Sequence, residues 1–380
     1  MFSHALGLAQ VDRRVEAGLA ARVLEPGVAQ RVRIMARLYE AAPSGARVSG
    51  EALAGLLGIS RAAVHKHVEA LRLAGVTLDS TRGGGYRLST QPDAVVPEVV
   101  LPLLFGADHD GSDESPGATS SSVGLPYRYS AAIDSTNESL KEIAQHEGVA
   151  GALVVTDDQT GGRGRLGRRW ISQPGKDLTF SVLLRPRVLP AEASRLVLAA
   201  GLAVAEVVQR LLGPGRTVGI KWPNDVLVDG RKVCGILSEA SMDMDRLHWV
   251  VIGIGLNVNS RPGEAGLWDG GDAGRPAPVS LAESAGEELP RPALLAQLLD
   301  ALAGHWRQVD TGAWESVRLA CAERDVLRGT SVVVRSGFST DIVVTEGTAE
   351  GLGPEGELLV RGHDGTVQPV RAGEVTLSGR

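Results

Sequence analysis

Apolar residues recur every three or four positions near the start of the chain, which is the spacing of one helix face. Residues 28–39 form one such stretch, and residues 50–57 and 61–74 form two more. Ser49 and Ser60 stand directly before the second and third stretches, and serine is a favoured helix N-cap. The pattern therefore predicts three helices.

Glycine and alternating residues follow these helices. Gly58 and Gly75 stand where the second and third helices should end. Residues 76–81 and 86–88 are strand-like, and Gly83-Gly84-Gly85 between them predicts a turn. The order helix, helix, turn, helix, hairpin is that of a winged helix.

The middle of the chain mixes both periods, and its last part shows only the shorter one. Helices are expected at residues 133–146, 191–212 and 294–307, and strands at 153–156, 179–184, 226–228, 232–240 and 249–258. Asp229-Gly230 predicts a hairpin turn. From residue 325 onward, short alternating stretches between glycines predict a small β-barrel.

Three segments lack such patterns. Residues 1–26 show little periodicity, so we expect a loose extension. Residues 106–124 are rich in Gly, Ser and Asp without Lys or Arg, which predicts a flexible linker. Residues 261–278 are interrupted by Gly and Pro and are expected to form a surface loop.

Charge is spread unevenly over the 380 residues. The net charge is −6, yet residues 27–90 hold nine Lys and Arg against four Asp and Glu. A basic module joined to an acidic remainder favours an anionic partner for that module alone. No apolar run approaches a membrane span, the start of the chain does not resemble a secretory signal, and only two cysteines occur, without CxxC. We therefore expect a cytoplasmic protein without a cysteine zinc site.

The helix over residues 61–74 has the character of a DNA recognition helix. Arg61, His65 and Lys66 are cationic or hydrogen-bonding groups that can reach bases and phosphates, while Val64 and Val68 face the core. An ordinary amphipathic helix with solvated histidines is the alternative. The following hairpin and the local positive charge favour DNA binding.

Residues 162–170, with the sequence GRGRLGRRW, are called the Gly/Arg loop here. The loop matches GxGxxG, but no helix start follows, so a dinucleotide site is not expected. Arg163 and Arg165 can instead grip carboxylate or phosphate oxygens while the glycines let the loop fold over a ligand. A solvated basic loop is the alternative.

Three further motifs admit both a structural and a chemical role. Pro223 restrains the backbone beside Lys221, which places an ammonium at a strand end or in an ordinary turn. Residues 134–138 suit a helix N-cap and also an amide or ureido ligand. The glycines of residues 253–259 allow contact with a flat ring or form a bulged strand. Cys234 lies in an apolar run without a nearby His and is expected in the core.

Together these segments resemble the biotin–protein ligase family. The resemblance rests on the order and separation of residues 162–170, 221–226, 232–237 and 253–259, and it covers about residues 27–100 and 125–380. Residues 49–88 resemble the winged helix of the bifunctional bacterial form, the biotin operon repressor. The chain departs from this pattern at residues 1–26, 106–124 and 261–278, and its wing has three glycines where a basic residue is expected.

The resemblance implies an α+β multidomain protein. Its parts would be a winged helix-turn-helix domain, a linker, an α/β ligase domain of class II synthetase type and an SH3-like β-barrel, at residues 27–92, 106–124, 125–320 and 325–380. It also implies that ATP and biotin form biotinyl-5′-AMP and pyrophosphate, with Mg²⁺ offsetting triphosphate charge. A lysine of a biotin carboxyl carrier domain then takes the biotin and releases AMP.

Site residues carry over from the same resemblance, without a protein-ligated metal. Arg163, Arg165 and Lys221 are expected to neutralise the reacting anions. The residues expected to bind biotin are Ser135, Thr136, Asn137, Gln159, Arg163, Gly164, Arg165, Trp170 and Lys221. Asn224 and Asn257 are expected on the nucleotide side, and Arg61, His65 and Lys66 on DNA.

A fused DNA-binding module further predicts regulation. If the adenylate orders the Gly/Arg loop at a dimer surface, a homodimer would place two recognition helices on operator DNA and repress transcription. Three alternatives are a ligase whose winged helix no longer binds DNA, a biotin-sensing transcription factor without catalysis, and a lipoate-type ligase. Retention of Lys221 and of the arginines argues against loss of catalysis.

Overall fold

The computed structural model describes residues 7–81, 83–106, 123–146, 148–264, 275–336 and 342–377. Contacts divide the chain into two compact units. The first comprises the described residues of 1–117 together with 124–129 and 290–300. The second comprises those of 118–123, 130–289 and 301–380. Most of the expected linker and the centre of the 261–278 loop lie outside the described residues.

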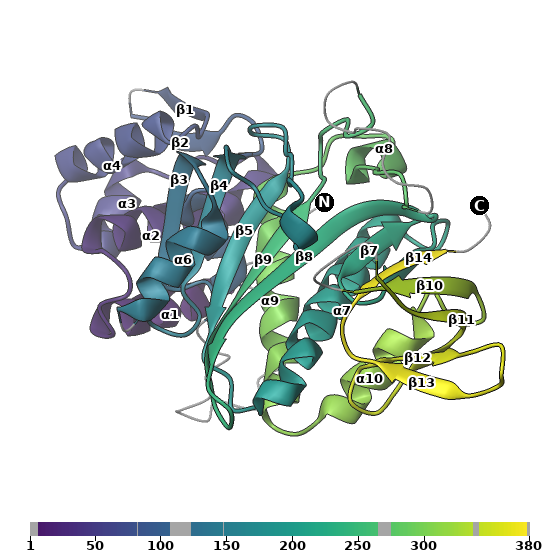
Figure 1. The fold of residues 1–380 in the computed structure, drawn as a ribbon. Helices are drawn as coiled ribbons and strands as arrows, with labels where there is room; N and C mark the ends of the chain where they lie inside the picture. The colour runs from purple at the N-terminus through teal and green to yellow at the C-terminus, as the bar shows by residue number, and fades with distance from the viewer. Residues whose placement is uncertain are drawn as a thin grey trace. The chain divides into compact units, whose positions relative to one another are not determined.

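The first unit contains the predicted winged helix (Figure 1). Its elements are α1 (Leu8–Ala20), α2 (Pro26–Ala41), a 3₁₀ turn (Ala42–Ser44), α3 (Gly50–Leu57), α4 (Arg61–Leu73), β1 (Leu78–Thr81), β2 (Gly85–Leu88) and α5 (Pro97–Phe105). Both expected N-caps form, because Ser49 Oγ accepts from the Ala52 amide at 2.9 Å and Ser60 Oγ accepts from the Ala63 amide at 3.2 Å.

Helix α1 corrects the expectation for residues 1–26. Residues 8–20 form a helix that packs on α2, and Val11, Val15 and Gly18 of this helix are buried. Arg33 of α2 pairs with Asp12 at 3.3 Å. The spacing of Val11, Val15 and Gly18 is helical, so a signal was present but weak. Residues 1–6 lie outside the described part of the chain.

The second unit is built on a seven-stranded sheet, in the order β3-β4-β5-β9-β8-β7-β6 over the described residues (Figure 1). Its strands are β3 (Tyr127–Ile133), β4 (Leu153–Gln159), β5 (Leu178–Leu184), β6 (Val218–Lys221), β7 (Asp225–Val228), β8 (Arg231–Met242) and β9 (Leu247–Leu256). The helices are α6 (Thr136–Gln145), α7 (Ala193–Leu212), α8 (Leu281–Ala285) and α10 (Trp314–Glu323), with 3₁₀ turns at Arg165–Gly167 and Pro190–Glu192. Helix α9 (Arg291–Asp310) is divided, because residues 291–300 belong to the first unit and the rest to the second. The helix expected from residue 133 begins later, because β3 runs to Ile133 and Ser135 is the N-cap.

Strand register separates two chemically different faces of this sheet. Small or polar residues share one face of the three central strands: Thr179, Ser181, Gly235, Gly253 and Gly255. The alternate residues on the other face are apolar: Phe180, Ile236, Ile252 and Ile254. Helix α7 packs on the apolar face and α6 on the opposite one (Figure 1). The polar face is therefore available to build a site beside α6.

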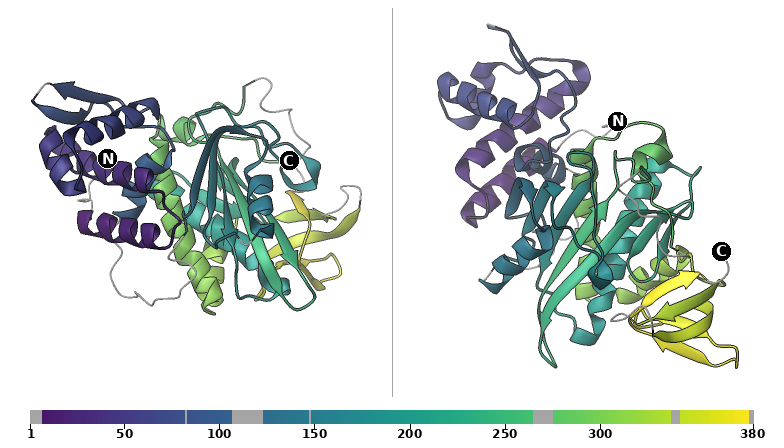
Figure 2. Two further views of the ribbon diagram at one scale, coloured as in Figure 1. Left: turned by 90° about the vertical axis from the view of Figure 1, so that its left-hand side faces the viewer. Right: turned by 45° about the horizontal axis from the view of Figure 1, so that its top comes forward.

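The last strands of the second unit form the predicted small barrel. They are β10 (Ser331–Arg335), β11 (Val343–Leu352), β12 (Leu358–Arg361), β13 (Val367–Val370) and β14 (Glu374–Leu377). Among the described residues these strands pair antiparallel, in the order β13-β12-β11-β10-β14, and the sheet curls around a small core (Figure 2). Val332, Val334 and Val360 are fully buried there.

The sequence predicts Cys234 in the core and contains no apolar run long enough to span a membrane. Cys234 and Cys321 are both free and buried, and burial raises the pKa of each thiol. This agrees with a core position rather than a nucleophile. Within the described ranges, no helix is both long and apolar enough to cross a bilayer.

Candidate functional site

A cavity of about 510 Å³ opens on the polar face of the central sheet, and the small barrel contributes to its wall. Its lining includes every residue predicted to bind biotin or nucleotide: Ser135, Thr136, Asn137, Gln159, Arg163, Gly164, Arg165, Trp170, Lys221, Asn224 and Asn257. Segments that are far apart in sequence thus meet as predicted. What each side chain does to a ligand remains a prediction.

The start of α6 and the end of β4 form a neutral, hydrogen-bonding end of the cavity. Ser135 caps α6 by accepting from the Glu138 amide at 3.4 Å. The amide and hydroxyl of Thr136 both donate to Gln159 Oε1, at 2.9 and 3.1 Å. Ser181, which sequence reasoning missed, lies behind them with its Oγ 2.7 Å from Thr136 Oγ1. We call Thr136, Asn137, Gln159 and Ser181 the amide wall.

Asn137 is fixed on all sides. Its Nδ2 donates to Glu239 Oε2 at 2.8 Å and approaches the carbonyl of Leu237 at 3.4 Å. Its Oδ1 lies 2.6 Å from Ser181 Oγ. A side chain at Gly253 would overlap Asn137, so glycine is required at that position of β9.

The Gly/Arg loop is a tight, hairpin-like turn and does not open a helix. The Gly164 amide donates to the Arg168 carbonyl at 2.7 Å, and the Trp170 amide donates to the Gly162 carbonyl at 2.9 Å. Leu166 has φ 59°, a left-handed conformation that costs energy outside glycine. This geometry agrees with the expectation that the loop is not a dinucleotide fingerprint.

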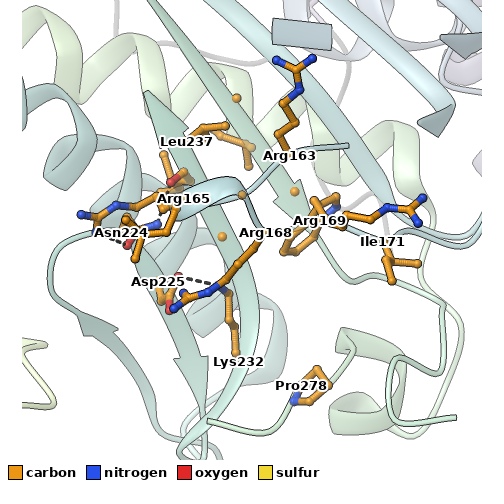
Figure 3. Close-up of a pocket in the computed structure, with 18 of the residues that line it drawn as sticks. Arg163, Arg165, Arg168, Arg169, Ile171, Asn224, Asp225, Lys232, Leu237 and Pro278 are labelled. Carbon is orange, nitrogen blue, oxygen red and sulfur yellow. Dashed lines mark hydrogen bonds and ion pairs between the residues drawn. The ribbon is translucent and has the colours of Figure 1, made fainter. Parts of the chain in front are cut away.

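The arginines of the loop are directed to different places (Figure 3). Arg163 is 58% exposed and donates to Glu138 at 2.7 Å. Arg165 is partly buried and donates to Asn224 Oδ1 at 3.2 Å and to the Gly373 carbonyl at 3.0 Å. Arg168 pairs with Glu374. Burial lowers the pKa of Arg165, and Asp225 opposes that effect.

Lys221 ends β6 and brings an ammonium to the cavity. Only 6% of Lys221 is exposed, and this burial lowers the pKa of its ammonium while nearby Asp225 favours the charged form. Burial disfavours ionisation of Asp225 too, but Lys232 at 2.7 Å and Lys221 hold the pKa of that carboxyl below its usual value. The result is a desolvated cluster of cations with one carboxylate at its centre.

Trp170 covers the backbone of the central strands. A side chain at Gly255 would overlap the Trp170 ring, and one at Gly235 would lie 3.1 Å from it. Of the two interpretations of residues 253–259, the structure favours a flat ring against Gly255, and that ring is the protein's own indole. The indole Nε1 is buried and finds no hydrogen-bond acceptor among the described residues.

Asn224 and Asn257 line the cavity with their amides already engaged. Asn224 Nδ2 donates to the Ile236 carbonyl at 2.8 Å, and Asn257 Nδ2 donates to the Val279 carbonyl at 3.1 Å. Both contacts hold a loop against β8 or β9. The nucleotide-side role predicted for these residues stays a prediction.

Several cavity groups had no clear signal in the sequence. Glu374 comes from the barrel, far along the chain, and accepts from Arg168 while Arg275 lies 3.7 Å away. Ser181 lies in β5, whose residues are apolar apart from Thr179 and Ser181. The alternation of these two polar residues was the only sequence signal that Ser181 faces the site. Asp225 and Lys232 lie within the segments 221–226 and 232–237 of the resemblance, yet their ion pair depends on the β7–β8 register.

The predicted DNA-contacting residues lie on the surface of the first unit. Arg61, His65 and Lys66 of α4 are exposed, whereas Val64 and Val68 are fully buried. The helix therefore presents the expected cationic face to solvent.

Known protein families and relatives match most of this chain. Residues 129–257 match the biotin/lipoate A/B protein ligase family, and residues 33–87 match an HTH domain. The bifunctional ligase/repressor BirA of Bacillus subtilis is 32% identical over 318 residues, covering 84% of this chain and 90% of that protein. BirA of Escherichia coli is 30% identical over 344 residues, covering 87% and 92%.

A solved structure shows the same ligase architecture. The biotin protein ligase from Aquifex aeolicus in complex with biotin and ATP has a TM-score of 0.54 and 27% identity, covering 66% of this chain and 98% of that one. Matched over most of its length in both sequence and domain order, the chain belongs to the family of bifunctional biotin–protein ligases and repressors.

Proposed function

We propose that the cavity activates biotin with ATP and then transfers it to a protein lysine. The biotin carboxylate attacks the α-phosphate of ATP, forming biotinyl-5′-AMP and releasing pyrophosphate. The ε-amine of the acceptor lysine then attacks the acyl carbon and releases AMP. The acceptor is a biotin carboxyl carrier domain, since relatives such as that of Paracoccus denitrificans are named biotin–[acetyl-CoA-carboxylase] ligases.

The single observation that carries this proposal is the polarity of the cavity. Neutral amides and hydroxyls of the amide wall line one part of the cavity, whereas Arg165, Arg168 and Lys221 lie around Asp225 and Glu374 in another part. A bicyclic urea with an acidic tail fits that gradient. Two anions must meet in the first step, and desolvated cations stabilise the charge that develops as they join.

The loop arginines also suit retention of the product. Arg165 is bonded to Asn224 and to the barrel at Gly373, which holds the Gly/Arg loop over the cavity. A closed loop keeps water from the labile mixed anhydride. No side chain needs to form a covalent intermediate.

Mg²⁺ would act with the triphosphate. Asp225 and Glu374 are the carboxylates of the cavity, and each is already paired with a cation. No cluster of three or more His, Cys, Asp or Glu suited to a metal occurs in the described ranges. We therefore infer that phosphate oxygens and water hold the ion, which would neutralise phosphate charge.

Exchange of labelled pyrophosphate into ATP tests the first step. We expect exchange that depends on biotin and is lost in Lys221→Met, and transfer of biotin to a carrier domain only when ATP is present. Exchange with lipoate but not biotin would establish the lipoate-type alternative. Biotin binding without exchange would establish a sensor without catalysis.

Residues 27–92 are proposed to bind operator DNA, residues 125–320 to hold the reactants, and residues 325–380 to complete the site. The adenylate-bound chain is proposed to dimerise and so to place two α4 helices on one palindrome. The free thiols favour a cytoplasmic location for the protein.

Selection of bound sequences from random duplex DNA, with and without biotin and ATP, tests the proposed DNA-binding role. Equal recovery of DNA in both conditions would contradict ligand-dependent repression.

A further inference from the structure

A chain of charged side chains adjoins the amide wall, and three of its members, Glu138, Lys141 and Glu239, are not among the residues that line the cavity. Glu239 Oε2 accepts from Asn137, while its Oε1 accepts from Lys141 at 2.8 Å. Lys141 also donates to Glu138 at 2.9 Å, and Glu138 accepts from Arg163. These contacts tie α6 to the middle of β8. No sequence motif pointed to Glu239 or Lys141.

The charge of Glu239 decides which way the amide of Asn137 faces. An ionised carboxylate accepts hydrogen bonds and donates none. Lys141 pairs with this carboxylate at 2.8 Å, and the pairing raises the pKa of Lys141. Asn137 must therefore turn Nδ2 toward Glu239, which leaves Oδ1 toward Ser181 and Gly253.

This orientation removes every donor of Asn137 from the cavity. Both N–H groups of Nδ2 are directed at Glu239 and Leu237, whereas Oδ1 retains a lone pair beyond its contact with Ser181. Gln159 is fixed in the opposite sense, because its Oε1 accepts twice from Thr136 and its Nε2 is left to donate. These two amides of the wall thus offer a ligand one acceptor, Asn137 Oδ1, and one donor, Gln159 Nε2.

A cyclic urea has the matching pattern, with N–H donors beside a carbonyl acceptor. We propose that Glu239 is a positioning residue that presents Asn137 Oδ1 as an acceptor, so that the site selects ligands carrying a ring N–H. A misplaced amide would put two donors face to face, which is costly in a buried site. This inference rests on the proposed function, since it takes biotin as the ligand.

Exchanging the donor and acceptor along one hydrogen bond tests the proposal. In Glu239→Gln the new amide can turn Asn137 around, and in Asn137→Asp two carboxylates face each other. Each single variant is expected to raise the KM for biotin at least tenfold, with the KM for ATP within twofold and kcat at saturating biotin within threefold. The combined variant restores the bond, because the amide introduced at position 239 can donate to the carboxylate introduced at position 137 and still accept from Lys141. We expect its KM for biotin within threefold of wild type.

Two controls separate orientation from charge and folding. Glu142→Gln removes a carboxylate from the exposed face of the same helix and should leave all three constants unchanged. Lys141→Met keeps the carboxylate of Glu239 and should raise the KM for biotin less than threefold. Thermal melting of each variant identifies any that fails to fold.

The outcomes are distinct. Absence of biotin-dependent exchange and of calorimetric biotin binding in the wild type would overturn the proposed function together with this inference. Normal wild-type activity with an unchanged Glu239→Gln variant would overturn the inference alone. Additive losses in the combined variant would do the same, because they would show that the two side chains do not act through their shared bond.

Discussion

The guanidinium of Arg165 lies 3.2 Å from Oδ1 of Asn224, so the Gly/Arg loop is fastened to the segment that begins at Lys221. The two motifs are 59 residues apart in sequence and supply cations to the same cavity. Loop closure and charge stabilisation are therefore physically linked. Three predictions concern this cavity, and a fourth concerns helix α4 of the first unit.

Arg165→Gly should release the adenylate early. The variant loses charge-assisted bonds to Asn224 and Gly373, each worth about 1.5–3 kcal/mol. We expect biotinyl-5′-AMP to leave roughly ten to a hundred times faster, measured by filtration of preformed complex and by labelling of bystander proteins. Arg169→Gly, in the same loop, is the matched control and should retain the product better. Unchanged retention in Arg165→Gly would refute this role.

Lys221→Met should lose activity while keeping or gaining stability. Burial lowers the pKa of the Lys221 ammonium in the folded chain, so the unfolded chain binds more protons at high pH. Stability from this group should therefore rise with pH between the lowered pKa and the usual 10.5, and the variant should lack that rise.

Asp225 keeps Lys232 as a partner in that variant, so we expect a neutral effect or a gain of about 1 kcal/mol at pH 7. Pyrophosphate exchange should fall roughly a hundredfold or more. Urea unfolding across pH and exchange kinetics provide the measurements. An active variant would show that the chemistry does not need this ammonium, and a variant that unfolds at pH 7 would show that the ammonium has a structural role.

Gly255→Ala should disrupt the site where Gly304→Ala does not. A methyl group at Gly255 would overlap Trp170, whereas Gly304 in α9 has open space around its Cα. Gly304→Ala should raise the free energy of unfolding by about 0.5–1 kcal/mol, since it removes a glycine from a helix interior. Gly255→Ala should displace the Trp170 ring and make it more accessible to a fluorescence quencher. It should also lower the affinity for ATP or biotin, measured by calorimetry. Equal effects of the two substitutions would exclude a steric role for Gly255.

Arg61→Ala and Lys66→Ala should weaken DNA binding. Each loses one cation from the exposed face of α4, so the slope of log affinity against log salt should fall by about one per removed phosphate contact. Arg13→Ala, an exposed arginine of α1, is the control and should leave the slope unchanged. Fluorescence anisotropy with the selected duplexes, at salt concentrations from roughly 50 to 200 mM, gives the slopes. An unchanged slope would indicate that α4 does not contact DNA.

Local sequence signals predicted much of the fold. Ser49 and Ser60 form the caps expected of them, and Asp229 and Gly230 both adopt the positive φ that their hairpin turn requires. Such features depend on neighbours in sequence, which one chain displays directly. Helix α1 was missed because its apolar stripe is short and broken by charges.

The cavity residues were predictable as motifs, but their partners were not. Glu239 lies in strand β8, where the alternation of residues predicts only which face of the sheet a side chain occupies. No local sequence signal indicates that Lys141 and Asn137 will contact it. Arg163 and Arg165 are equivalent in the sequence, yet one is solvated and the other is bonded to the barrel. These differences depend on tertiary register, which periodicity does not encode.

The bond from Arg165 to the Gly373 carbonyl spans 208 residues of sequence. During synthesis from the N-terminus, a ribosome therefore releases α4 and the amide wall long before the carbonyl that fastens the loop emerges. The Gly/Arg loop can be fastened to the barrel only when nearly all of the chain has been made, so this closure is absent during most of translation.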